Sequence, residues 1–165
     1  MGVGIIAKFE IGPLEEYIQL LEHQKTDKIQ YVIKKSIYNG ASITADQIRR
    51  EIESLPVVEK VTQKGVLKWE KEDLLNGFGV SPFQVKNDST DVKIGFDGYG
   101  CHKTKTHKNG VPIPLTARSI LKGTSFRPKN DFVRRAVNKI KKKVIEKMNE
   151  TINEEIKKEM SKNGN

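Results

Sequence analysis

The sequence lacks several features that define common classes of protein. Cys101 is the single cysteine in 165 residues, so no internal disulfide can form and a reducing compartment is expected. No apolar run approaches the roughly 18 residues that a membrane-spanning helix needs. The apolar stretch near the N-terminus is also too short for a secretory signal. These absences predict a cytoplasmic protein with no membrane segment.

The sequence also lacks the residue patterns of common enzyme and cofactor sites. No glycine-rich loop ends in Gly-Lys-Ser or Gly-Lys-Thr, and no glycine pattern between a strand and a helix suits a dinucleotide. Cys101, His102 and His107 come nearest to a metal site, but structural zinc needs four ligands and no fourth is nearby. A polar loop is the preferred interpretation, and a small metal-dependent enzyme is the alternative. We therefore expect no catalytic residue, no cofactor-binding residue, no metal ligand and no cofactor.

Positive charge is concentrated in the C-terminal part of the chain. Residues 118–165 contain 14 Lys and Arg against 6 Asp and Glu, whereas residues 1–117 contain 16 against 15. Within residues 127–143, Asp131 is the only acid beside eight basic residues. This segment predicts contact with DNA or another anionic partner, although a solvated helix surface explains it equally well. The residues expected to make such contact are Lys129, Arg135, Lys139, Lys142 and Lys143.

The first 56 residues are predicted to be mostly helical. Apolar residues recur at helical spacing between residues 13 and 55, which indicates two or three antiparallel helices. Asn39–Gly40 can end one of these helices, because both residue types tolerate a left-handed conformation. Thr44 then resembles the N-cap of the next helix, with Gln47 completing a capping box.

Residues 57–97 are predicted to be β-rich. The turn signal Lys64–Gly65 lies among β-branched residues, and "EDLLNGFGV" indicates a short helical turn that stops at Asn76–Gly77. The clearest strand pair surrounds a turn at 87–89, because apolar residues alternate on both sides of it. The predicted fold is therefore α+β, with N-terminal helices, a small antiparallel β-sheet in the middle and a long C-terminal α-helix. The alternating residues are Phe83, Val85, Val92, Ile94 and Phe96.

The remaining segments complete a single domain over residues 1–165. Residues 98–111 contain too few apolar side chains to pack and predict a surface loop, and residues 112–123 predict a short helix. Pro128 suits the entry of a long basic helix over residues 128–160.

An apolar stripe marks this last helix. Its mean step of about 3.9 residues exceeds the 3.6 of a helical turn, so the stripe drifts around the helix. We expect the first half of the stripe to pack on the chain's own core and the second half to pack on another subunit or to fray. The stripe consists of Val133, Val137, Ile140, Val144, Met148, Ile152, Ile156 and Met160.

Most of the chain, including its helical N-terminal third, resembles a known family of phage proteins, and the C-terminal half carries the motif. The run "DVKIGFDGYG", a polar loop with a proline, and "ARSILKGTSFRPKNDFVRRAV" before a basic helix are similar to neck proteins of long-tailed bacteriophages. These are also known as head–tail connector, tail-completion or minor tail proteins, the HK-ninety-seven gene-product-ten family. The family pattern runs from an aromatic strand and a small-residue turn to Arg-Pro-x-x-x-Phe-x-Arg-x-Ala at the last helix. The matching residues are Arg127, Pro128, Phe132, Arg134 and Ala136.

The resemblance implies a structural virion protein without catalytic activity. Such proteins assemble in the bacterial host cytoplasm and form a homo-oligomeric ring in the neck of the virion. The ring would join head-closure or adaptor proteins to the tail terminator or tail tube proteins, and DNA would pass through its lumen. A small non-specific DNA-binding protein that uses the basic helix is one alternative, and a tail terminator protein is another.

Two predictions concern the motif itself. Phe132 is expected to be buried against the sheet at the start of the last helix. Arg134 and Arg135 point about 100° apart on a helix. One of them is therefore expected in an ion pair within the ring interface, and the other is expected to be exposed.

Overall fold

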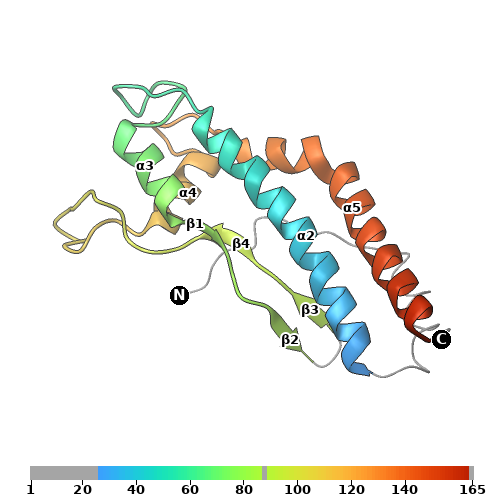
Figure 1. Ribbon diagram of the computed structural model, residues 1–165. Coiled ribbons are helices and arrows are strands. Elements are labelled where there is room, and N and C mark those ends of the chain that lie inside the picture. Colours follow the sequence, from blue (N-terminus) through green and yellow to red (C-terminus); the bar gives the residue numbers. More distant parts are fainter. Residues whose placement is uncertain (1–25, 87–88, 164–165) are drawn as a thin grey trace.

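Two long helices, a β-hairpin and two short helices make up the described part of the chain (Figure 1). The computed structural model describes residues 26–86 and 89–163. Four helices and two small antiparallel sheets occur in these ranges, which confirms the predicted α+β class. The helical pattern predicted over residues 13–25 and the turn residues Asn87 and Asp88 lie outside the described residues.

α2 (Thr26–Glu53) is a single helix, so the predicted break at Asn39–Gly40 is wrong. Gly40 is buried inside the helix, and a Cβ atom there would meet the Met148 side chain. Glycine is therefore explained by close helix packing and not by a helix end. Thr44 does not cap a second helix, because its hydroxyl donates to the Gly40 carbonyl oxygen one turn earlier, at 2.8 Å.

α3 (Lys68–Gly77) confirms the short helical turn predicted to stop at Asn76–Gly77. The helix begins earlier than predicted, at Lys68, so the prediction of a β-rich segment is wrong for the residues from 68 onward to that turn. The helix begins where Glu70 reaches back, and its Oε2 accepts a hydrogen bond from the Leu67 N–H at 2.9 Å. Residues 57–66 precede it and contain one isolated bridge, between Val57 and Val66. β-branched residues favour a strand only where a partner strand packs beside them.

The predicted strand pair is confirmed around its turn and extends further than the sequence indicated. β2 (Gln84–Lys86) pairs with β3 (Ser89–Asp91), and β1 (Phe78–Val80) pairs with β4 (Ile94–Phe96), both antiparallel. The sequence did not predict β1, because Asn76 and Gly77 directly precede it and this pair of residues indicates a turn. Figure 1 shows the two ribbons as one long hairpin beside α2.

The loop and the short helix after the hairpin are confirmed. Residues 98–111 form a surface loop, and α4 (Ile113–Lys122) occupies the segment predicted to be a short helix. Gly123 follows the helix with φ of +73°, a left-handed conformation that glycine adopts at little cost.

α5 (Phe132–Asn163) is the long C-terminal helix, and it begins after Pro128 and not at it. The preceding residues are held in a turn, because the Asn130 N–H donates to the Ile120 carbonyl oxygen at 3.0 Å. This contact with the end of α4 prevents those residues from joining the helix.

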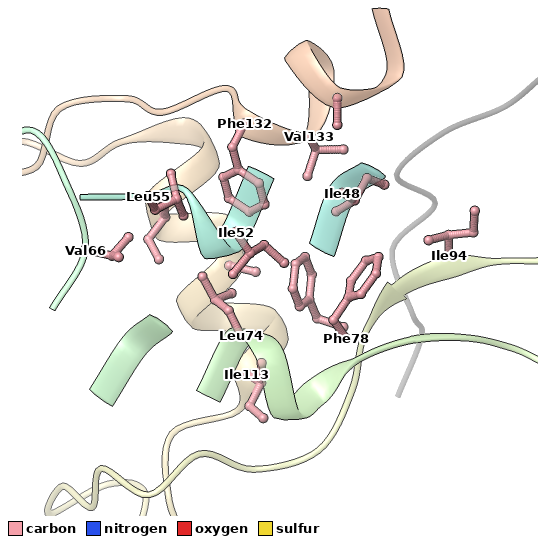
Figure 2. Close-up of a cluster of buried hydrophobic side chains, with 14 of the residues drawn as sticks. Ile48, Ile52, Leu55, Val66, Leu74, Phe78, Ile94, Ile113, Phe132 and Val133 are labelled. Atoms are coloured by element: carbon pink, nitrogen blue, oxygen red, sulfur yellow. The ribbon is translucent and has the colours of Figure 1, made fainter. Parts of the chain in front are cut away.

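The hydrophobic core lies where α2, α3, α4, the hairpin and the start of α5 meet (Figure 2). Phe132 is fully buried at its centre, and its ring meets the Phe96 ring edge-on at a centroid distance of 6.4 Å. The prediction that Phe132 packs against the sheet is therefore confirmed. Other core residues labelled in Figure 2 include Ile48, Ile52, Leu55, Leu74, Phe78 and Ile113.

α2 covers α5 over most of its length, which corrects the expectation for the second half of the stripe. In that second half Met148 and Ile152 are buried within the chain and Ile156 is half-buried, whereas the side chain of Met160 lies outside what the structure describes. The physical reason is that α2 is one long helix and packs along α5, whereas two shorter helices would not have covered the same length of α5. A salt bridge between Lys35 and Glu155 at 2.8 Å extends the contact beyond Ile152.

Candidate functional site

Arg127 of the family-like motif is buried and has a structural role. Its Nη2 atom lies 2.5 Å from Oε1 of Glu70 on α3, and the two side chains are only 5% and 4% exposed. Nη1 of Arg127 donates to the Ser119 hydroxyl on α4 at 3.3 Å. This guanidinium therefore connects α3, α4 and the entry of α5, and it is not accessible to a phosphate or a partner.

The other four motif residues divide between the core and the surface. Phe132 and Ala136 are fully buried, whereas Pro128 and Arg134 are exposed. The motif therefore fixes the position of α5 through its buried members, and Arg134 is available to solvent.

Glu51 on α2 engages two of the predicted contact residues. Its Oε1 accepts a hydrogen bond from Lys139 Nζ at 2.5 Å, and its Oε2 lies 3.7 Å from Arg135 Nε. Arg135 also donates to Asn130 at 3.0 Å. Of the two neighbouring arginines, Arg135 thus forms the ion pair and Arg134 is exposed, as predicted. The acid belongs to the same chain, and the expected location of the pair in a ring interface stays a prediction.

The free positive charge on α5 is smaller than the sequence indicated. Lys129 forms an exposed salt bridge with Asp131 at 3.0 Å, a type of pair that contributes little energy. Lys142 and Lys143 are exposed, and no acid in the described part of the chain forms an ion pair with them. These two lysines are the predicted contact residues that the structure leaves open.

The loop over residues 98–111 places Cys101 and His102 against α3. The Cys101 backbone N–H donates to the buried Asp73 carboxylate at 3.0 Å, and the His102 ring stacks on Trp69 at a centroid distance of 4.6 Å. Desolvation and the Asp73 carboxylate raise the pKa of the Cys101 thiol, which disfavours the thiolate that binds metal. Within residues 26–86 and 89–163, no three His, Cys, Asp or Glu residues are grouped as metal ligands.

Sequence reasoning missed a set of exposed apolar side chains. Tyr38 on α2 is 60% exposed and its ring lies 6.5 Å from that of Phe83, beside the hairpin. Val85 on β2 is 53% exposed, and Tyr31 lies two turns before Tyr38 on α2. The seven-residue spacing of the tyrosines, off the core stripe of α2, is the signal that could have found them. Other exposed large apolar residues are Val57, Val80, Tyr99, Leu115 and Phe126.

Two further observations concern membrane helices in the described residues and similarity to known proteins. The helices in the described residues are all too short or too polar to cross a bilayer. Comparisons with protein-family models, with curated proteins and with solved structures gave no match.

Proposed function

We propose that the chain is a structural subunit of the neck of a tailed bacteriophage. Copies of it would form a ring that joins the head-closure proteins to the tail and lets DNA pass. The motif at the entry of α5 supports this proposal, because its buried residues fix the position of the long helix, which is a structural role. The observation that carries the proposal is the hairpin, whose outer edges have no partner strand among residues 26–86 and 89–163, together with the apolar side chains beside it.

The hairpin is built to accept another strand. Within the described residues each ribbon has only two strands, so each strand has one edge whose N–H and C=O groups lack a partner strand. Val85 lies on this hairpin, and Tyr38 lies on the adjacent helix. Backbone edges with apolar side chains beside them are suited to strand addition by a second chain.

Other exposed apolar side chains lie outside the hairpin: Val57 follows α2, Leu115 lies on α4, and Phe126 lies between α4 and α5. Figure 1 shows α3 and α4 at the other end of the molecule from β2 and β3. Two different surfaces on one chain can form a heterologous, head-to-tail contact between copies. Such contacts close into a ring when the rotation between neighbours is a simple fraction of a turn.

The test is assembly of the purified protein, measured by size-exclusion chromatography with light scattering. We expect the wild type to form a closed oligomer, and Val85→Lys to shift it toward the monomer. Gln84→Lys is the matched control, because it adds the same charge to the neighbouring exposed position and should leave assembly intact.

Binding to the adjoining virion proteins distinguishes the possible positions in the particle. A ring that binds a head-closure protein on one side and a tail terminator on the other is a neck ring. One that binds only the end of the tail tube is a tail terminator. A protein that stays monomeric, binds neither partner, and can be deleted without loss of tailed infectious particles contradicts the proposal.

The alternative of a small non-specific DNA-binding protein is supported by Lys142 and Lys143, the open lysines on α5. Fluorescence anisotropy over a salt series tests it, because phosphate contacts produce a steep dependence of affinity on salt. Loss of binding in a variant of these lysines would favour this alternative.

A further inference from the structure

The tip of the loop between β4 and α4 carries a separate cluster of positive charge. We call residues 102–109 the lysine loop; its sequence is "HKTKTHKN". Lys103, Lys105 and Lys108 are all exposed, and the segment contains no acid. No acid in the described part of the chain forms an ion pair with any of these three lysines. This charge was concealed at the sequence level, because the count for residues 1–117 averages it with acids elsewhere.

Hydrogen bonds hold the lysine loop in one shape. The His107 N–H donates to the Thr104 hydroxyl at 3.0 Å, and the Thr104 N–H donates to the His107 carbonyl oxygen at 3.2 Å. At the base, the Val111 N–H donates to the His102 carbonyl oxygen at 2.8 Å. The lysines therefore extend from a closed turn, so less conformational entropy is lost when they bind.

Contacts with α3 fix the loop to the body of the protein. His102 stacks on Trp69, and the buried Asp73 carboxylate accepts the Cys101 N–H. Gly110 has φ of +109° and passes so close to the Gly100 carbonyl that a Cβ atom would collide with it. The lysine loop is thus a supported projection, and Figure 1 shows it extending away from α5. It forms a surface separate from the open lysines of α5.

We propose that the lysine loop contacts the phosphate backbone of nucleic acid without reading its sequence. Its side chains are cationic or neutral donors, and three lysines can each replace a counterion of DNA. It has no apolar side chain that could anchor in a lipid bilayer, which argues against a membrane surface as the ligand. The inference rests on the proposed function for its setting, since it names the part of the ring subunit that would face the DNA.

The experiment compares two triple variants that remove the same charge. Lys103→Gln, Lys105→Gln and Lys108→Gln neutralise the lysine loop. Lys141→Gln, Lys142→Gln and Lys143→Gln remove the same charge from exposed residues of α5, the competing surface for DNA. Binding to a short fluorescein-labelled DNA duplex of mixed sequence is measured by anisotropy between about 50 and 200 mM salt. Light scattering and thermal melting of each variant report on assembly and folding.

We expect the loop variant to bind at least about tenfold more weakly at low salt, with a salt slope reduced by about 0.9 for each lysine that contacts a phosphate. The α5 variant should retain more affinity than the loop variant, and both variants should melt and assemble normally. Equal losses in both variants, a loss in the α5 variant alone, or no binding by the wild type would overturn the inference. So would tighter binding to vesicles containing phosphatidylserine than to DNA.

The outcomes separate this inference from the proposed function. A protein that forms a ring and binds its virion partners, but has no affinity for DNA, contradicts the inference and leaves the neck assignment standing. A protein that binds DNA through the lysine loop, yet neither assembles nor binds those partners, supports the inference and contradicts the neck assignment.

Discussion

Substitution of Phe132 by alanine removes the aromatic ring at the point where α5 joins the hydrophobic core. The side chain has 0% of its surface exposed, and its ring meets Phe96 of β4 edge-on. No solvent can fill the space that the ring leaves unless the surrounding helices move. The full cost of a buried phenylalanine truncation, about 3–5 kcal/mol of unfolding free energy, is therefore expected.

This magnitude corresponds to a large change in thermal stability. For a domain of 150–250 residues, each kcal/mol lowers the melting temperature by about 2–4 °C. Phe132→Ala should thus melt roughly 6–20 °C below the wild type. Urea denaturation followed by far-ultraviolet circular dichroism gives the free energy, and calorimetry gives the melting temperature.

Phe126→Ala is the matched control, because it removes the same atoms from a residue only a short distance away in sequence. Phe126 is 61% exposed, so its truncation should change the unfolding free energy by less than about 0.5 kcal/mol. Both variants are compared in the same oligomeric state, since Phe126 belongs to a proposed subunit contact. A loss below about 1 kcal/mol for Phe132→Ala would refute the reasoning that this ring anchors α5.

Two further predictions concern ion pairs. Arg127→Ala leaves Glu70 buried without its cation and should cost about 3–5 kcal/mol of unfolding free energy. Adding Glu70→Gln should recover part of this loss, because it removes the unpaired buried charge. Urea denaturation measures both variants, and a double variant no more stable than Arg127→Ala would contradict the prediction. Hydrogen bonds from Lys158 and Lys35 lower the pKa of Glu155 from 4.5 to about 2. The ionised carboxylate therefore adds to the unfolding free energy at any pH above its ordinary pKa, and this stabilisation is lost as the pH falls toward about 2. Glu155→Gln should therefore be less stable than the wild type near neutral pH and equal to it near pH 2, and a difference that stays constant with pH would exclude this linkage.

Local sequence signals determined the features whose causes are themselves local. Alternating apolar residues predicted the strand pair on both sides of residues 87–88, and the poverty of apolar residues in 98–111 predicted a surface loop. The short helix α4 and the burial of Phe132 likewise follow from spacing and residue type. In each case the residues that determine the feature lie close together in the sequence or on one face of one element.

The tertiary structure alone decided which charges are free and which apolar surfaces are covered. Glu51 lies far from Lys139 in sequence, and Glu70 lies far from Arg127, so residue counts could not reveal that they are paired. A continuous α2 covers Met148 and Ile152 of α5, which were expected to pack on another subunit or to fray. Gly40 permits this close packing at a position where the local sequence resembles a helix end. Ion pairing and burial depend on contacts between distant segments, and local spacing does not encode those contacts.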